Sequence, residues 1–283
     1  GAFLSSTPPF QNAMAMDANR CGIPVVYGFC RGIGSVSYAA AVLLLGFVLE
    51  RHAPTLLLPV FAALTACGLL AMSGFRLPER PDEAADRPAE HRSIAAVLRS
   101  HPRFALTLLG CMFFFLTHTI SNTYMNALVG KAGGTASAVG TSLAISAVLE
   151  LPAMTLVSRL QKRFSPGFFL RFAAGAEIVK FLIFYLAHSM PLIYLGHCMQ
   201  FFQFAVYAPA TVYYVAAALP ERDQLKGQSL IYVAGSGLGG ALGNLLGGRL
   251  LDRSGIQAAL LLGTVSAAAS LLTFCLSTRE DSR

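Results

Sequence analysis

The chain contains no tryptophan and few charged residues. Of its 283 residues, only 12% are Asp, Glu, Lys or Arg, whereas 55% are hydrophobic. Soluble globular domains carry about 25% charged residues. A soluble protein of the present composition could not cover its apolar interior with polar surface, so a soluble globular fold is excluded.

Motifs for metal binding and enzyme chemistry are also missing. The six cysteines are scattered without a C-x-x-C pair, whereas zinc sites and disulfide frameworks need suitably spaced cysteines. The motifs H-E-x-x-H and G-x-S-x-G do not occur, and a membrane-embedded enzyme would need such a metal cluster or nucleophile. We therefore predict no enzyme, no metal site and no cofactor besides a proton gradient.

The first 20 residues begin with glycine and lack the basic, apolar and small-residue regions of a signal peptide. They are typical of the end of a further helix. We expect the chain to be a fragment whose N-terminal part is missing.

The hydrophobic residues occur in long runs. Each run reaches about 20 residues, the length of helix that crosses a bilayer. None alternates between polar and apolar positions as the strands of a membrane barrel do, which leaves helices as the spanning structure. We predict an all-α membrane protein with about eight transmembrane helices, at residues 25–49, 54–75, 104–129, 136–157, 168–187, 192–219, 225–246 and 256–276.

A glycine-rich stretch, GSGLGGALGNLLGG at residues 235–248, contains the pattern G-x-G-x-x-G. A nucleotide site of this type needs a preceding strand and an acidic residue about 20 positions later, and the acidic partner is missing at that offset. Gly235, Gly239, Gly243 and Gly247 recur at every fourth residue, so they share one helix face that a neighbouring helix can approach closely. The stretch predicts helix packing and not nucleotide binding.

The net charge of +7 follows membrane topology. Lys and Arg are concentrated in alternate loops, such as 76–103 and 159–171, and are rare in the opposite loops, so the first set is predicted to be cytoplasmic. Because topology accounts for the basic excess, no nucleic-acid partner is expected. The expected location is the inner cell membrane, which the chain crosses several times.

One segment, residues 76–103, interrupts the hydrophobic pattern with Pro, Arg and acidic residues. It predicts a cytoplasmic linker, with a short helix at Ser93 to Leu98. Six predicted helices follow it, which is the size of one half of a transporter whose halves move around a central site. We predict the remainder of an N-terminal helical half at 1–75, the linker at 76–103 and a C-terminal six-helix half at 104–283.

Ionisable residues inside the predicted helices need an explanation, because each costs about 2.5 to 3.5 kcal/mol at the helix centre. Arg31 either extends to the cytoplasmic headgroups or, among Gly28, Gly32 and Gly34, faces the bundle interior and binds an anion or a hydroxyl-rich ligand. Glu150 precedes Pro152 and is a candidate for solute hydroxyls or a proton. Its alternative role is as partner of an arginine on a neighbouring helix.

Glu177 and Lys180 have the i, i+3 spacing of a pair along one helix face, and the pair is either structural or functional. His197 lies one turn from Gln200 and two from Gln203, which predicts a polar stripe, although a histidine packed between helices is the alternative.

A second predicted stripe consists of His118, Asn122 and Asn126, at i, i+4 and i+8. Hydrogen-bonding groups on one face of an apolar helix favour a water-filled cavity over lipid. The alternative is hydrogen bonding between helices, worth about 0.6 kcal/mol per contact.

Four motifs together resemble the major facilitator superfamily, and within it the branch similar to lactose permease and related sugar or nucleoside proton symporters. They are YGFCRGIGSVSY, LELPAMTLVSRLQKRF, HCMQFFQFAVYAPATVYYV and GQSLIYVAGSGLGGALGNLLGGRLLDRSG. The resemblance covers nearly the whole chain. It implies a fragment of the major facilitator fold with helices 5 to 12 and the end of helix 4.

The resemblance also implies roles for single residues. Arg31 matches the fifth-helix arginine that binds sugar hydroxyls, and Glu150 the eighth-helix glutamate. His197 and Lys180 fall at or near the proton-coupling residues of helices 10 and 9. The chain departs from the family at three points. Gln200 replaces the carboxylate one turn after the histidine, and Gln11 and Asn12 stand where the permease has a fourth-helix glutamate. The tryptophan that stacks on sugar is absent.

These observations predict a secondary active transporter that moves a small polar solute, of the sugar or nucleoside class, together with protons by alternating access. The expected partners are the solute, protons and the lipid bilayer, and the full-length carrier is expected to be a monomer. Two alternatives stay open: a proton-driven exporter of the same fold, and a nonfunctional remnant. The predicted solute-binding residues are Arg31, Asn12, Asn122, Asn126 and Glu150, and the predicted proton-coupling residues are His197, Glu150, Glu177 and Lys180.

Overall fold

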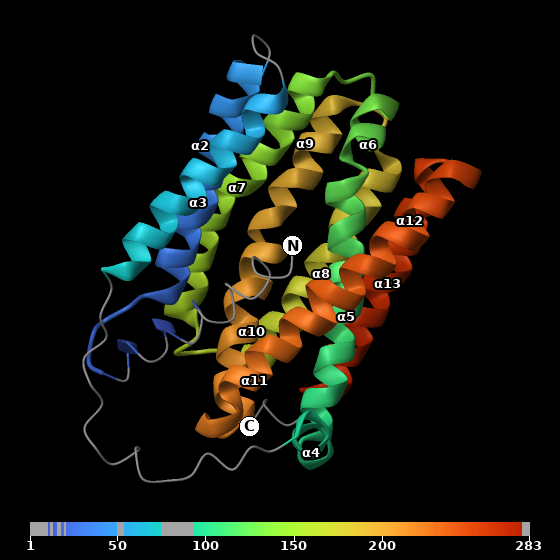
Figure 1. Cartoon of the computed structure of the whole chain (residues 1–283). Helices are drawn as coiled ribbons and strands as arrows, with labels where there is room; N and C mark the ends of the chain where they lie inside the picture. The colour runs from blue at the N-terminus through green and yellow to red at the C-terminus, as the bar shows by residue number, and fades with distance from the viewer. Residues whose placement is uncertain are drawn as a thin grey trace.

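The computed structural model shows a bundle of helices (Figure 1). The residues that it describes are 11, 14–15, 18–19, 21–49, 54–74 and 93–278. Over these ranges the secondary structure is helical without strands, so the predicted all-α class is confirmed. Most of the predicted linker, residues 76–92, lies outside the described residues, as does Asn12.

The elements follow one another as long helices interrupted at defined points. In chain order they are α2 (Tyr27–Leu49), η1 (Pro54–Leu56), α3 (Leu57–Ser73), α4 (Ile94–Ser100), α5 (Pro102–Thr123), α6 (Met125–Lys131), α7 (Ala136–Leu160), α8 (Pro166–Leu186), α9 (Met190–Cys198), η3 (Met199–Phe201), α10 (Phe204–Ala218), α11 (Glu221–Tyr232), η4 (Val233–Gly239), α12 (Gly240–Ser254) and α13 (Ile256–Ser277).

Local sequence signals set several helix ends. The short helix predicted from Ser93 is confirmed as α4, because the Ser93 hydroxyl accepts a hydrogen bond of 3.2 Å from the Ala96 N–H and caps the helix. Ser165 caps α8 in the same way, and Pro166 occupies its first turn. Gly255 adopts a φ of 75°, which separates α12 from α13.

Five helical stretches in the described part of the chain are long and apolar enough to cross a membrane. They are Pro102–Thr123, Ala138–Leu160, Met190–Ala218, Glu221–Ser254 and Ile256–Ser277. The other three predicted spans coincide with α2, α3 and α8, so the chain is a multi-pass membrane protein.

Helix α8 carries charged residues and is still compatible with a membrane span. Its side chains Glu177 and Lys180 are buried, with exposed fractions of 0% and 2%, whereas the apolar Val179, Leu182 and Leu186 are exposed. Polar groups thus face the protein interior and apolar groups face outward, which is the distribution that a lipid environment favours.

Two predicted spans are interrupted. The span predicted at residues 104–129 is wrong in its second part, because α5 ends at Thr123 and a separate helix, α6, begins at Met125. The span predicted at 192–219 is divided by the 3-10 helix η3 and by Gln203, whose φ of −100° and ψ of −94° lie outside the helical region. Both breaks change which side chains share a face.

The glycine stripe packs against α5, as predicted. A Cβ at Gly239 would overlap the carbonyl oxygen of Met112, and a Cβ at Gly243 would lie 2.7 Å from the carbonyl oxygen of Leu116. The helix is not regular here, because η4 is a π-helical segment. Segment η4 and helix α12 therefore approach α5 closely where only glycine fits, and the nucleotide-site interpretation is excluded.

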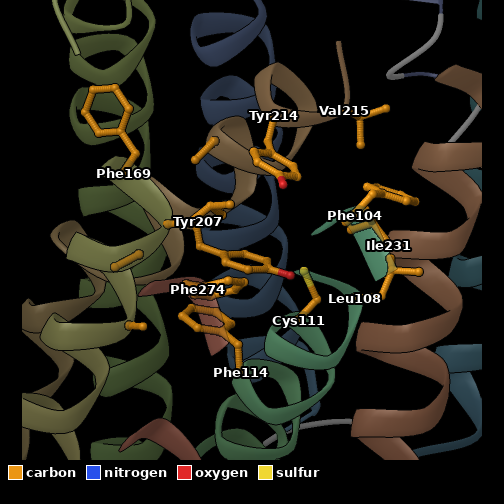
Figure 2. Packing of buried hydrophobic residues seen from close by; sticks show 14 of the residues in the cluster. Phe104, Leu108, Cys111, Phe114, Phe169, Tyr207, Tyr214, Val215, Ile231 and Phe274 are labelled. Carbon is orange, nitrogen blue, oxygen red and sulfur yellow. The ribbon is translucent and has the colours of Figure 1, made fainter. Parts of the chain in front are cut away.

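An aromatic cluster fills the interior between α5, α8, α10 and α13 (Figure 2). The rings of Phe114 and Tyr207 stack at 3.9 Å between centroids, and Phe274 and Cys111 lie beside them. Burial of large side chains in this layer holds the C-terminal helices together.

Helix α2 packs mainly against α7, at the left of Figure 1. At its first turns Gly28 and Gly32 lie against Met154 and Leu151, where a Cβ would overlap the α7 backbone or side chain. The Gly28 N–H donates a hydrogen bond of 3.0 Å to the Ser158 hydroxyl. This contact brings the N-terminal part of the chain against the C-terminal helices.

Candidate functional site

A cavity of about 320 Å³ lies where α2, α5 and α7 face the interrupted helix α9–η3–α10. Two charged side chains, Arg31 and Glu150, line it, together with polar and aromatic side chains: Ser35, Tyr38, Asn122, Ser146, Gln200 and Phe204. Arg31 is half-buried and lines this cavity between the helices, which supports the alternative that it faces the bundle over extension to the headgroups.

A chain of hydrogen bonds begins in the cavity and ends at a buried cation. An Arg31 guanidinium N–H donates to the Ser35 hydroxyl over 3.2 Å. The Ser35 hydroxyl in turn donates to Glu150. From the other side, the Gln200 amide N–H donates to Glu150 over 3.0 Å, and the Lys180 ammonium donates to the Gln200 oxygen over 3.1 Å.

Glu150 is the centre of this chain. Its two carboxylate oxygens accept from Ser35 on α2 and from Gln200 on η3, and only 8% of the residue is exposed. Both cations of the chain reach Glu150 through a neutral side chain. A buried carboxylate needs such donors, and a polar ligand that displaced either one would alter the whole chain.

Glu177 and Lys180 interact electrostatically along α8, but they do not form the direct pair that their spacing predicts. Lys180 donates to Gln200 instead, and neither carboxylate oxygen of Glu177 has a hydrogen-bond partner in the described part of the chain. The spacing places both residues on one face of α8, but Gln200 reaches the ammonium group from a neighbouring helix. Sequence spacing could not reveal this competitor.

His197 lies beside the cavity and does not line it. Its Nδ1 is 3.1 Å from the Ser146 hydroxyl, and its ring packs against Phe184. The predicted stripe of His197, Gln200 and Gln203 is wrong as a single face, because the helix changes to η3 within it. Gln200 meets Glu150, whereas the Gln203 amide is buried with no hydrogen-bond partner among the described residues.

The second predicted stripe is also divided. Asn122 lines the cavity and donates to the His118 carbonyl oxygen over 2.9 Å, and the His118 ring stacks on Phe204 at 4.4 Å. Asn126 is exposed on α6, beyond the break at Tyr124, and it is not among the residues that line the cavity. The prediction that these three residues share one face is therefore wrong at its last member.

Sequence reasoning missed several cavity residues. Ser35 follows Arg31 by four positions and so shares its helix face, which could have identified it. Ser146 stands one turn before Glu150 in the same way. Tyr38 and Phe204 gave no signal, because an aromatic residue in an apolar helix is indistinguishable from one that faces lipid.

Helices α2 and α7 pack directly against each other at the end nearer the C-terminus of α7. The Ser158 hydroxyl receives hydrogen bonds of 3.0 Å from the Gly28 N–H and from the Tyr213 hydroxyl, and Tyr27 packs edge-on against Tyr213. The cavity lies on the other side of this contact, toward Asn122. In the described residues no three His, Cys, Asp or Glu side chains form a metal-binding group.

Comparison with known proteins agrees with this architecture. A family model described as "MFS_1 like family" matches residues 3–262. A maltose permease of Geobacillus stearothermophilus is 28% identical over 257 residues, which cover 90% of this chain and 64% of the permease. The uncharacterized transporter YwbF of Bacillus subtilis (strain 168) is 23% identical over 258 residues, or 91% of this chain and 64% of YwbF. The chain thus spans about 64% of the length of these relatives.

Two solved structures have a similar fold. A crystal structure of the E. coli fucose:proton symporter FucP matches with a TM-score of 0.56 and 16% identity, over 82% of this chain and 60% of that one. FucP in the outward conformation matches with a TM-score of 0.58 and 17% identity, over 96% of this chain and 69% of that one. At these identities the likeness concerns the fold.

Proposed function

The chain belongs to the MFS_1-like family of the major facilitator superfamily, and on this premise we propose that it acts in proton-coupled symport of a small polar solute of the sugar or nucleoside class. The solute binds in the cavity at Arg31 and Glu150, and the carrier exposes this site to each side of the membrane in turn. The location proposed is the inner cell membrane, where the full-length carrier works as a monomer.

The observation that carries the proposal is the hydrogen-bonded chain that joins Arg31 to Glu150 within the cavity. A sugar hydroxyl both donates and accepts hydrogen bonds. Arg31 can only donate, and an ionised Glu150 can only accept, whereas Asn122 and Gln200 can do both. One positive and one negative charge in the same cavity suit a neutral solute.

Two aromatic rings complete the site. Tyr38 and Phe204 line the cavity, and aromatic faces pack well against the C–H groups of a sugar or the face of a nucleobase. Solute binding then combines oriented polar contacts with apolar contacts, which is the usual composition of a small-molecule site.

Solute binding and proton binding are coupled in this proposal because hydrogen bonds connect the solute site with the ionisable groups. Glu150, Glu177, Lys180 and His197 are the groups proposed to couple to protons. A solute that takes hydrogen bonds from Ser35 or Gln200 changes the surroundings of Glu150 and, through Gln200, those of Lys180. Only the loaded or the empty carrier then changes conformation.

In this proposal residues 1–75 belong to the N-terminal helical half, residues 76–103 are the linker, and residues 104–283 form the C-terminal half. The two halves meet at α2 and α7. Movement between conformations then consists of separating and rejoining this contact around the cavity.

An uptake screen tests the function. Membrane vesicles with the carrier are supplied with labelled sugars and nucleosides under an inward proton gradient, and Arg31→Ala is compared with Arg159→Ala, which changes an exposed arginine on α7. We expect accumulation of at least one solute by the unchanged carrier and by Arg159→Ala, and its loss in Arg31→Ala. Outward movement of solute under the gradient would favour the exporter alternative, and movement of no solute of these classes would contradict the proposal.

A further inference from the structure

Glu177 is a buried carboxyl group that forms no direct ion pair, because Lys180, which lies one turn away on α8, donates to Gln200 instead. Its exposed fraction is 0%. Neither carboxylate oxygen has a hydrogen-bond partner in the described residues, and the residue does not line the solute cavity. An ionised carboxylate in such surroundings is strongly disfavoured, and the group becomes neutral instead. Glu177 is not a member of the hydrogen-bonded chain through Glu150, so that chain does not explain why a carboxyl group is buried at this position.

A break in the neighbouring transmembrane helix lies next to this group. Gln203, at the break between η3 and α10, has an exposed fraction of 0%. Its side chain lies close enough to Glu177 to interact with the carboxyl group, although the two groups do not have the geometry of a hydrogen bond. Membrane carriers commonly bind their coupling ion where a helix is discontinuous. Two polar side chains from two helices, neither of which forms a hydrogen bond with another described residue, therefore meet at one buried position.

The charges around this position restrict which ion it can hold. Lys180 lies on the same helix within electrostatic reach of both Glu177 and Glu150, and it also interacts with His118 on α5 and His197 on α9. Helix α10 contributes only tyrosines to the ionisable groups, and α13 has no acidic, basic or histidine side chain. A metal cation would meet the ammonium group and would need several oxygen ligands, whereas a proton needs neither.

We propose that Glu177 is the site of the coupled proton, outside the solute cavity, and that Lys180 changes partner between Gln200 and Glu177 as this proton is released and taken up. The inference rests on the proposed function for its role in transport. In the present conformation Glu177 is the neutral acid, and the ammonium group donates to Gln200. Loss of the proton to the aqueous phase leaves a carboxylate three residues from Lys180, to which the ammonium group then donates.

The change of partner transmits proton occupancy to the solute site. When Lys180 leaves Gln200, the Gln200 amide is free to turn away from Glu150. Glu150 then accepts one hydrogen bond fewer. Its free oxygen is available to solute hydroxyls, or the carboxylate strengthens its bond with Ser35. One proton on α8 thereby changes the contact between α2 and α7, although neither helix touches the proton.

Infrared difference spectroscopy tests the protonation without any transport. The full-length carrier is reconstituted in liposomes and titrated with pH, and the carboxylic-acid C=O band is followed. We expect a band in the unchanged carrier that is absent from Glu177→Gln and retained in Glu150→Gln. Absence of the band from the unchanged carrier, or its persistence in Glu177→Gln, would overturn the proposal.

Transport by the same preparations tests the coupling. Glu177→Gln resembles the protonated acid in shape, so solute exchange across the membrane should stay within about threefold of the unchanged carrier, while proton-driven accumulation falls about tenfold or more. Glu177→Asp should restore part of the accumulation. Retained proton-driven accumulation in Glu177→Gln, or accumulation that follows a Na⁺ gradient and not pH, would refute the inference.

A second variant serves if Glu177→Gln fails to fold. Lys180→Met removes the cation that stabilises the ionised carboxylate, so the infrared band of Glu177 should persist to higher pH than in the unchanged carrier. An unchanged titration in Lys180→Met would contradict the partner exchange. If the unchanged carrier moves no sugar or nucleoside, the proposed function fails, and the infrared band alone still decides whether Glu177 holds a proton.

Discussion

Ser35 on α2 and Glu150 on α7 are joined by a hydrogen bond, although 115 positions separate them in the sequence. The bond lies at the cavity, about two helical turns along α2 from the tight contact of Gly28 with α7. The same carboxylate accepts from Gln200. A single side chain therefore connects the junction of the helical parts with the buried cation on α8.

The energetic link between Ser35 and Glu150 should be measurable by a double-mutant cycle. Ser35→Ala and Glu150→Gln each remove part of a hydrogen bond to a charged group, whose net contribution is about 1.5 to 3 kcal/mol. We expect the double variant to lose less stability than the sum of the two single variants, with a coupling energy above about 0.5 kcal/mol. Thermal unfolding of the carrier in detergent gives the values, and strict additivity would contradict the link.

The two asparagines of the predicted stripe should differ in function. Asn122→Ala removes a polar group from the cavity lining, and we expect solute affinity to fall about threefold to tenfold, equivalent to one neutral hydrogen bond. Asn126→Ala is the matched control, because Asn126 lies exposed on α6 outside the cavity lining. Binding of the transported solute is measured for both, and equal losses would show that the assignment of the cavity is wrong.

The glycine stripe should be sensitive to the addition of one methyl group at a defined position. Gly239→Ala places a Cβ against the carbonyl oxygen of Met112, so η4 and α5 must separate, at a cost of about 1 to 3 kcal/mol. Gly237→Ala is the control in the same segment, since the nearest atom to its Cβ is 3.8 Å away. Melting temperatures should fall for Gly239→Ala only, and a comparable fall in both would argue against close packing.

The contact at Gly28 should control the separation of α2 and α7. In Gly28→Val the new side chain would overlap Met154 and Ser158, so we expect this end of the two helices to move apart. Spin labels at Phe29 on α2 and at Arg159 on α7, which are exposed, report the distance between the helices. The distance should lengthen.

Gly34→Ala is the control on the same helix, because the atom nearest to a Cβ at Gly34 is 3.9 Å away. It should leave the distance between the labels unchanged. An unchanged distance in Gly28→Val would mean that the contact does not restrain the helices.

Part of the site was predictable because its signal is local. Arg31 and Glu150 stand out as charges within apolar helices, whose burial in lipid needs a reason, and the structure brings both to the cavity. Ser35 shares the helix face of Arg31, but its bond to Glu150 was not predictable, because Glu150 lies on another helix. Gln200 was not predictable as a partner either, because it comes from a third helical segment and a neutral polar residue gives no comparable signal. The pairing expected between Glu177 and Lys180 failed for this reason.

The sequence by itself determined that the chain forms helices long and apolar enough to cross a membrane, since run length and composition decide how a segment is solvated by lipid. It also determined that the glycine face packs closely against a neighbouring helix, because residues spaced four positions apart lie on one face of a helix. Only the tertiary structure decided which polar groups meet. The breaks at Tyr124 and Gln203 rotate the following residues away from a continuous helix face, and hydrogen-bond partners depend on rotations and distances between helices that the linear order of residues does not contain.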